Sequence, residues 1–381
     1  MSKVYNFSAG PSMLPEPALQ AAAKAAIDYN GCGMSLMTMS HRSKPVVAMF
    51  AETEALLREA LDIPSNFKVL FLQGGASLQF CMVPMNLLPQ DGCADYTITG
   101  VWAKKAAKEA KQFGKVNEAC SSAEATFSYI PKELKQDPNA TYLHVTSNNT
   151  IYGTQWKSFP KPANPNRYLV VDMSSDILSR KFDWTDMGLV FAGAQKNMGP
   201  AGVTIAIVRD DILGKVERTI PTMLNYTTHI EGESMFNTPP VFSVYVVNET
   251  LKWVKSVGGV DALKAINDRK AAKLYKAIDD SSFFKNPVVA QETADTLLSK
   301  HPAMPYYKQT DGIKIPAAWL IEQAGCKRLT AGDAGVYEHQ PLVIVNRGNA
   351  TPDNVMRLAQ MIQERVEEQF GISLQREVIY I

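Results

Sequence analysis

Short apolar runs alternate with amphipathic stretches along the first two thirds of the chain. Five runs have the length and residue types of buried strands: Phe67–Leu72, Tyr142–Val145, Tyr168–Val171, Gly188–Phe191 and Val203–Val208. Helical periodicity lies between them, for example from Ala103 to Phe113. Strands that alternate with helices predict an α/β domain, in which helices cover both faces of a mainly parallel sheet. Ligands of such sheets bind beyond the carboxyl ends of the strands.

The pattern changes towards the C-terminus. Residues 241–277 have a helical pattern, and the composition changes near residues 279–282. We therefore predict two domains, residues 1–280 and a smaller α+β domain at residues 281–381, and expect the first ~15 residues to pack toward the smaller one. A long amphipathic helix is predicted from Thr351 to Phe370, because Thr351-Pro352-Asp353-Asn354 resembles an N-terminal cap and Gly371 a C-terminal one.

Composition excludes several classes of protein. The 381 residues are 46% hydrophobic and 20% charged, as in an ordinary globular protein, and the net charge of +1 gives no reason to expect nucleic acid or a membrane surface as partner. The five cysteines have no CxxC spacing, which argues against a disulfide framework and a zinc site. No signal peptide and no apolar run of membrane-spanning length is visible, so we expect a cytoplasmic protein without a metal centre.

The most informative segment is Phe191–Pro200, in which Lys196 lies among small residues directly after a predicted strand. The preceding strand, Tyr168–Val171, is followed by Asp172. This pairing suits pyridoxal 5'-phosphate, because a strand-end aspartate can hold the pyridine nitrogen protonated while a lysine carries the aldehyde as a Schiff base. A solvated loop lysine is the alternative, and Lys196 alone would not exclude it.

Two loops present groups that suit a phosphate or a carboxylate. Gly74-Gly75-Ala76-Ser77 lies between a strand and a helix, where backbone N–H groups can face a phosphate; a plain tight turn is equally compatible with four such residues. His41-Arg42 suits an oxyanion, because a guanidinium binds one through two hydrogen bonds, although a surface basic pair has the same local sequence.

Three further segments offer side chains that suit a flat polar ligand. Trp102 has a large face that can stack on a pyridine ring, although most tryptophans of this kind belong to a core. Thr150 follows a polar strand end and can bond a ring hydroxyl, although its segment by itself is typical of a turn. Asn237 and Thr238 precede a proline pair, where a loop that stops before a helix is the alternative.

Taken together, these motifs resemble the phosphoserine aminotransferase family, in the family's order and from the N-terminus to about residue 280. The matching segments are Asn6-Phe7-Ser8-Ala9-Gly10-Pro11, Ser40-His41-Arg42, Gly74-Gly75-Ala76-Ser77, Thr99–Lys105, Ser147–Gly153, Asp172–Asp176, Gly193–Asn197 and Phe236–Pro240. The resemblance implies the large domain of fold-type I pyridoxal-phosphate enzymes, a homodimer with shared active sites, and small amino-acid and keto-acid substrates. The implied reaction belongs to serine biosynthesis: the amino group of O-phospho-L-serine is transferred to 2-oxoglutarate, which gives 3-phosphohydroxypyruvate and L-glutamate.

The resemblance also implies a role for each residue. Lys196 would hold the cofactor and shuttle the proton, Asp172 would keep the pyridine nitrogen protonated, and Trp102 would stack on the ring. Thr150 would bond the ring oxygen. The phosphate would be bound by Ala76, Ser77 and Gln195, joined by Asn237 and Thr238 of the partner subunit. His41 and Arg42 would bind the acidic groups of the substrate.

The tail departs from that family, because no Gly-His-Arg segment and no later substrate-binding arginine motif follows residue 280. It resembles instead the C-terminal domain of UDP-N-acetylenolpyruvoylglucosamine reductase, a flavin enzyme of cell-wall synthesis. The matching segments are Ser282–Pro287, Ala318–Gly325 and Phe370–Ile372 with Glu377-Val378. That resemblance maps two proton donors onto Ser282 and Glu377, although the reductase's flavin-binding domains have no counterpart here.

We therefore expect a complete cofactor site with weakened turnover, unless Arg328, Arg347 or Arg376 replaces the missing clamp. The alternatives are a reductase role through the tail, a non-catalytic cofactor-binding fusion, and another chemistry of the fold such as desulfuration or decarboxylation, against which the motif set argues.

Overall fold

The computed structural model describes residues 6–280, 283–338 and 340–377. The chain divides into two compact units, Met1–Ile266 and Asn267–Ile381. The division falls inside a helix, whereas the predicted boundary near residue 280 lies at the end of that helix.

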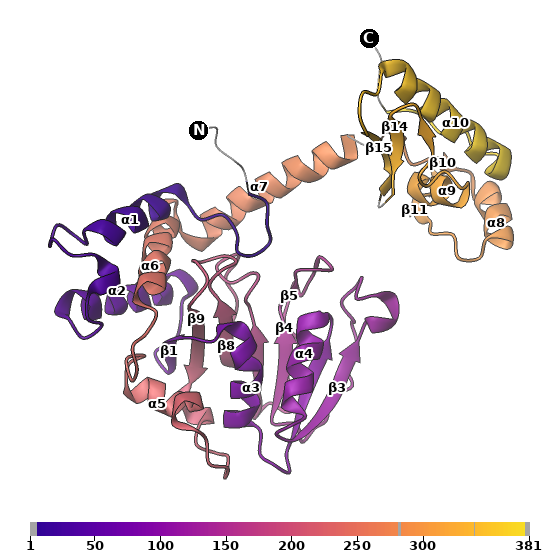
Figure 1. The fold of residues 1–381 in the computed structure, drawn as a ribbon. Helices are drawn as coiled ribbons and strands as arrows, with labels where there is room; N and C mark the ends of the chain where they lie inside the picture. Colours follow the sequence, from indigo (N-terminus) through magenta and orange to yellow (C-terminus); the bar gives the residue numbers. More distant parts are fainter. Residues whose placement is uncertain (1–5, 281–282, 339, 378–381) are drawn as a thin grey trace. The chain divides into compact units, whose positions relative to one another are not determined.

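The first unit is built around a seven-stranded sheet (Figure 1), in the order β1-β9-β8-β7-β4-β2-β3. Its strands are β1 Phe67–Leu72, β2 Cys93–Ile98, β3 Lys115–Ser121, β4 Tyr142–Thr146, β7 Tyr168–Asp172, β8 Met187–Gly193 and β9 Thr204–Arg209, and β5 Asn148–Asn149 pairs with β6 Thr154–Gln155 in a small hairpin. Only β9 runs against its neighbours, so the carboxyl ends of the other six strands meet at one edge. The predicted mainly parallel sheet is confirmed.

Helices cover both faces of this sheet. Successive residues of a strand point to opposite faces, so each strand contributes side chains to two cores. Val69 and Phe71 of β1 contribute to a core that includes side chains of α1, α2 and α6. Leu70 and Leu72 contribute to the opposite core, with side chains of α3, α4 and α5. The helices are α1 Glu16–Ile27, α2 Lys44–Leu61, α3 Gly75–Leu87, α4 Val101–Ala110, α5 Tyr226–Glu231, α6 Val241–Ser256 and α7 Gly259–Asp280.

Two features of the first unit differ from the sequence prediction. Strands β2 and β3 were not expected, because β2 contains Asp95 and Thr97 and β3 is a partly exposed edge strand. The helix expected over residues 241–277 is interrupted between α6 and α7, where Gly258 has φ 102° and Gly259 φ 82°. These angles lie outside the helical region and are accessible to glycine, so the helix ends there.

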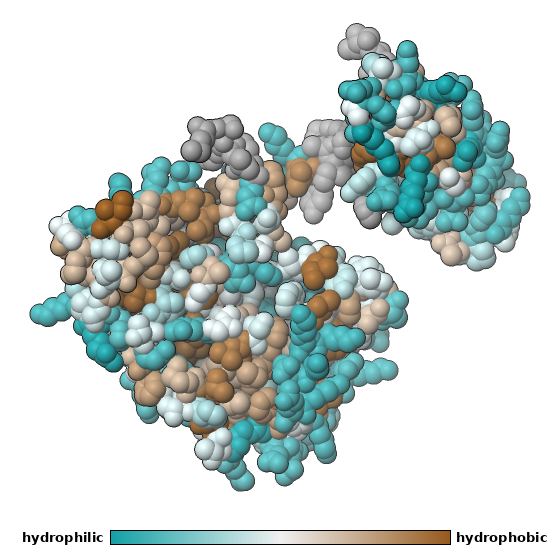
Figure 2. Space-filling model, viewed as in Figure 1, coloured by the Kyte–Doolittle hydropathy of each residue, from teal (hydrophilic) through white to brown (hydrophobic). Residues whose placement is uncertain are grey.

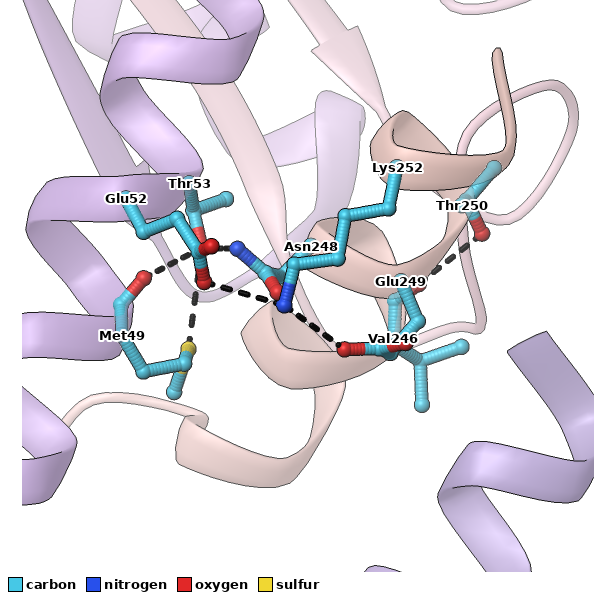
Figure 3. Close-up of polar contacts among 8 residues, drawn as sticks. All are labelled: Met49, Glu52, Thr53, Val246, Asn248, Glu249, Thr250 and Lys252. Atoms are coloured by element: carbon cyan, nitrogen blue, oxygen red, sulfur yellow. Dashed lines mark hydrogen bonds and ion pairs between the residues drawn. The ribbon is translucent and has the colours of Figure 1, made fainter. Parts of the chain in front are cut away.

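A buried polar contact joins α2 to α6 (Figure 3). Asn248 Nδ2 donates to Thr53 Oγ1 at 3.0 Å, and Thr53 donates to the Met49 carbonyl at 2.7 Å. Lys252 pairs with Glu52 at 3.0 Å and with Glu249 at 3.1 Å, nearer the surface. The two helices are thereby fixed in register, and each begins directly after a segment with candidate site residues.

The second unit has two three-stranded antiparallel sheets, in the orders β10-β12-β11 and β13-β14-β15. Its elements after α7 are β10 Val288–Val289, α8 Gln291–Lys300, β11 Tyr307–Gln309, β12 Gly312–Lys314, α9 Ala317–Gln323, β13 Thr330–Ala331, β14 Ala334–Tyr337, β15 Gln340–Asn346 and α10 Pro352–Phe370. The predicted C-terminal helix is confirmed: Thr351 and Asn354 form a capping box, and Gly371 ends the helix with φ 67°. Among the described residues, no helix is long and apolar enough to cross a membrane.

Candidate active site

Two neighbouring strands bring Asp172 and Lys196 to the same edge of the sheet. Asp172 is the last residue of β7, and Lys196 follows the end of β8 by three residues. The Met173 N–H donates to the Phe191 carbonyl at 2.8 Å, which holds the two strand ends together. Both residues therefore lie at the edge of the sheet where ligands of such folds bind.

Asp172 is buried, and its carboxylate is held from one side. Ser174 donates to Asp172 Oδ1 through its backbone N–H at 2.9 Å and its hydroxyl at 2.6 Å, and Ser174 Oγ accepts from the Gly193 N–H at 3.1 Å. Asp172 Oδ2 has no hydrogen bond to the described residues. Burial raises the pKa of the carboxyl, which the Ser174 hydrogen bonds and the charge of Lys196 oppose. A cation placed against Oδ2 would favour the ionised form.

The Lys196 amine is held by two hydroxyl groups. Its Nζ donates to Thr150 Oγ1 at 2.9 Å and to Ser175 Oγ at 3.2 Å, and lies 6.0 Å from the centroid of the Trp102 ring. Burial lowers the pKa of the amine, while the charges of Asp172 and Asp176 oppose this shift. The site therefore favours a neutral amine more than water does, as a nucleophile requires.

The N-terminal segment lies directly against Lys196. A Cβ built on Gly10 would lie 2.8 Å from Lys196 Cγ and 3.4 Å from its Cε, so residue 10 has room only for a hydrogen. The Ser12 N–H donates to the Gln195 carbonyl at 3.0 Å, and the Ser12 hydroxyl donates to the Lys196 carbonyl. The segment thus limits the directions that the lysine side chain can take.

The Gly74–Ser77 loop opens α3 at the carboxyl end of β1. Gly74 has φ 83°, and a Cβ built on it would lie 2.3 Å from a Leu78 methyl carbon, so this turn requires glycine. Ala76 is half-buried and Ser77 exposed, within the first helical turn. The N–H groups of such a turn have no intrahelical partners and face outward, as a phosphate site needs.

Two further candidates for phosphate binding lie near this loop or near Lys196. The Thr238 carbonyl accepts from Gln73 Nε2 at 2.7 Å, which places the Asn237-Thr238 segment beside residue 73 of the same protomer. Gln195 precedes Lys196, and its Oε1 lies within 2.5 Å of where a Gly193 Cβ would be.

His41 and Arg42 precede α2, and no hydrogen bond or ion pair among the described residues joins either of them to Lys196 or Asp172. Arg42 is exposed, whereas His41 is 7% exposed and its Nε2 is buried without a hydrogen-bond partner among the described residues.

Sequence reasoning missed Ser174, Ser175 and Asp176. Asp176 is buried, accepts from Gln155 Nε2 at 2.9 Å and is also bonded by the Ser147 hydroxyl. The signal was present in the run Asp172-Met173-Ser174-Ser175-Asp176, because short polar side chains directly after a buried strand must point into the site or cap it.

In the second unit, Ser282 lies outside the described residues. The Glu377 N–H donates to the Phe283 carbonyl at 3.1 Å, so the two mapped segments are paired. Each tail arginine has a partner within this unit: Arg328 pairs with Glu338 at 3.2 Å, Arg347 donates to the Val336 carbonyl at 3.2 Å, and Arg376 donates to Gln363 at 2.8 Å.

A buried aspartate, a lysine between hydroxyls and a helix-opening glycine turn are groups that suit pyridoxal phosphate. Comparison with known proteins gives the class of enzyme. Residues 4–302 match the class-V aminotransferase family. The phosphoserine aminotransferase of Geobacillus kaustophilus is 49% identical over 289 residues, which cover 75% of this chain and 79% of the relative. The chain belongs to the class-V aminotransferases and, within them, to the phosphoserine aminotransferase family.

Solved structures support the same assignment. The phosphoserine aminotransferase of Bacillus circulans subsp. alkalophilus aligns with a TM-score of 0.71 and 38% identity, over 96% of this chain and 99% of that one. The pyridoxal-phosphate-bound phosphoserine aminotransferase of Trichomonas vaginalis aligns with a TM-score of 0.70 and 37% identity, over 74% of this chain and 84% of that one. Fold class, enzyme class and cofactor are therefore as expected from the sequence.

The C-terminal part of the chain matches a different family. Residues 275–381 match the C-terminal domain of UDP-N-acetylenolpyruvoylglucosamine reductase, so the second predicted resemblance is confirmed. The two family matches overlap at residues 275–302. The chain thus joins segments that match two families.

The residues present fit pyridoxal phosphate. Asp172 Oδ2 is available for a protonated ring nitrogen, Lys196 Nζ lies within reach of the Trp102 face, and the α3 N-terminus lies at the same sheet edge. When bound, the cofactor supplies an electron-accepting ring for electrons released at the amino-acid carbon.

Proposed function

We propose that the chain catalyses amino transfer between O-phospho-L-serine and 2-oxoglutarate, giving 3-phosphohydroxypyruvate and L-glutamate, in the manner of the relatives named phosphoserine aminotransferase. The observation that carries the proposal is the pairing of Lys196 and Asp172 at adjacent strand ends, with small polar side chains around both. The Ser174 bonds to Oδ1 leave Oδ2 of Asp172 to hold the proton on the ring nitrogen.

The other residues would bind and orient the ligands. Trp102 would cover one face of the ring, Thr150 would bond the ring oxygen, and Ala76, Ser77 and Gln195 would hold the phosphate. Lys196, as a neutral amine, would accept the proton of the substrate carbon and return it on the other side of the reaction. The exposed guanidinium of Arg42 supports a role for His41-Arg42 in binding acidic substrate groups.

We further propose a homodimer, in which Asn237 and Thr238 of each protomer serve the partner's phosphate site. Large apolar side chains are exposed on α1, on the segment after it and on α2: Leu19, Ile27, Met34, Met37 and Val47. Figure 2 shows apolar surface over α1 and α2. A second copy is a natural cover for such a surface. Light scattering after size exclusion should give twice the mass of 41.9 kDa.

Turnover should be weak, because the tail does not supply the family's substrate arginines. Arg328, Arg347 and Arg376 are all engaged within the second unit. Loss of one partner of a buried charge pair costs about 2–5 kcal/mol, roughly 30- to 5,000-fold in kcat/KM.

The test is the visible absorption of the purified protein before and after addition of O-phosphoserine. A cofactor band that converts slowly, and that is absent from Lys196→Ala, would support both the activity and its impairment. Rapid full conversion would overturn the impairment, and a band that never changes would overturn the activity. Replacement of residues 281–381 by the corresponding tail of the Geobacillus kaustophilus relative should restore turnover without changing the cofactor band.

A second candidate is a flavin-linked reductase role for the tail, which the match of residues 275–381 favours. The hydrogen bond from the Glu377 N–H to the Phe283 carbonyl supports it too, because it joins two segments that match the reductase family. Bound flavin in the purified protein, seen by its fluorescence after denaturation, would favour this function.

A further inference from the structure

Ser175 holds the Lys196 amine together with Thr150. Its Oγ accepts from Lys196 Nζ at 3.2 Å and lies 2.5 Å from Thr150 Oγ1, and it also contacts the Asn148 carbonyl at 3.4 Å. Lys196 has no ion pair with a carboxylate among the described residues. The partners of the amine are therefore two neutral hydroxyls, which orient it without locking it in the charged form, as a carboxylate would.

The two hydroxyls differ in what else they do. Under the proposed function Thr150 also bonds the ring oxygen of the cofactor, so its hydrogen-bonding capacity is shared. Ser175 comes from the turn after β7, whose residues Asp172 and Ser174 are fixed by the bonds described above. Its position is thus tied to the strand that carries the ring-nitrogen partner, and it remains available to Lys196.

We propose that Ser175 is a positioning residue, which holds the Lys196 amine towards the reaction centre whenever that amine is not bonded to the cofactor. The inference rests on the proposed function for the role of the amine. A hydroxyl at this place reduces the number of conformations that the long lysine side chain can adopt away from its reactive position. The close approach of Gly10 to the aliphatic part of Lys196 restricts the same side chain further.

The first test uses the full-length protein freed of cofactor. Labelling of Lys196 by trinitrobenzenesulfonate is followed against pH by mass spectrometry of its peptide. Ser175→Ala removes an acceptor of the ammonium protons, so the labelling profile should move to lower pH. Ser179→Ala is the matched control, because Ser179 lies in the same turn and makes no side-chain hydrogen bond to the described residues, and its profile should not move.

The second test measures the rate at which the cofactor-free protein bonds pyridoxal phosphate at Lys196, trapped by borohydride, at a pH above the labelling midpoint of every variant, so that the amine is neutral in each of them. Ser175→Ala should be slower by about tenfold, the equivalent of one hydrogen bond, and Ser175→Thr should recover most of the rate. In the loaded enzyme kcat should fall with little change in KM. Should Ser175→Ala fold poorly by circular dichroism, Ser175→Cys keeps the volume and weakens the bond.

The outcomes separate the two proposals. If the wild type is trapped at Lys196 while the Ser175 variants match Ser179→Ala in pH profile and rate, the role of Ser175 is wrong and the proposed function stands. If borohydride attaches the cofactor to another lysine or to none, the proposed function itself is wrong.

Discussion

The contact between α2 and α6 permits a quantitative test of one buried hydrogen bond. Thr53 and Thr250 are both buried threonines that donate to the carbonyl four residues earlier, at 2.7 Å and 2.8 Å. Only Thr53 also accepts from another helix, through Asn248 Nδ2 at 3.0 Å (Figure 3). Replacement by valine keeps the shape and removes the hydroxyl from each, so the two variants differ mainly in the fate of Asn248.

Thr53→Val should cost more free energy of unfolding than Thr250→Val. After Thr53→Val the Asn248 amide has neither partner, since its Oδ1 is already without one among the described residues. An unsatisfied buried donor costs about 1–3 kcal/mol. In Thr250→Val the Val246 carbonyl keeps its helical bond and no other group loses a partner, so the loss should stay at the net value of one hydrogen bond, about 0.5–1.5 kcal/mol, which Thr53→Val also loses.

Urea unfolding of the full-length protein, followed by tryptophan fluorescence, measures both values, because four of the five tryptophans belong to the first unit. A difference of about 1–3 kcal/mol between the variants is expected. Equal losses would refute the reasoning, because they would mean that Asn248 finds another partner or that water reaches it. Because α2 and α6 begin after His41-Arg42 and Asn237-Thr238, substrate KM of Thr53→Val is a useful second readout.

Three other outcomes follow from the structure. Gly10→Ala should slow attachment of the cofactor to Lys196 by about two- to tenfold, because the added methyl would displace the lysine side chain and an off-rotamer side chain costs about 0.5–1.5 kcal/mol. Stopped-flow absorbance checks this, with Ser8→Ala as control. Burial lowers the pKa of His144 from 6.5 to about 3. Below pH 6.5 the histidine is therefore protonated in the unfolded chain but not in the folded one, so the free energy of unfolding falls as the pH drops. Between pH 7 and 5, His144→Phe should therefore lose about 2 kcal/mol less stability than the wild type, and equal losses would contradict the assignment. Asp172→Asn should weaken cofactor binding by about 10- to 100-fold in an absorbance titration, because a charge-assisted hydrogen bond is lost, whereas unchanged affinity would show that Oδ2 faces no cation.

The strand-end chemistry could be predicted from the sequence because it depends on local pattern. A buried run that ends in Asp172, and a second run followed by Lys196 among small residues, already place both side chains at one edge of a parallel sheet. The C-terminal helix was predictable for the same reason, since its cap residues are adjacent to it in sequence.

Contacts between distant segments could not be predicted in this way. The Ser12 hydroxyl donates to the carbonyl of Lys196, which is 184 positions away in the sequence, and no pattern in residues 6–15 predicts that contact. The same holds for Ser175 as a partner of Lys196, because a serine in a turn is equally compatible with a local bond to its own backbone. The break at Gly258 is not predictable from the local sequence, because an isolated Gly-Gly pair inside an apolar periodicity does not always end a helix.

The contacts of the cofactor residues argue that cofactor binding and substrate binding are separable in this chain. Lys196 is fixed by residues 10–12, Thr150 and Ser175, and Asp172 by Ser174, all within the first unit. The second unit, which matches another family, contributes to none of these bonds. A change of tail should therefore alter kcat/KM for O-phosphoserine by its effect on substrate binding, while the rate at which the cofactor-free protein bonds pyridoxal phosphate at Lys196 stays the same. A tail exchange that altered both would mean that the first unit needs its own C-terminal domain to place the lysine.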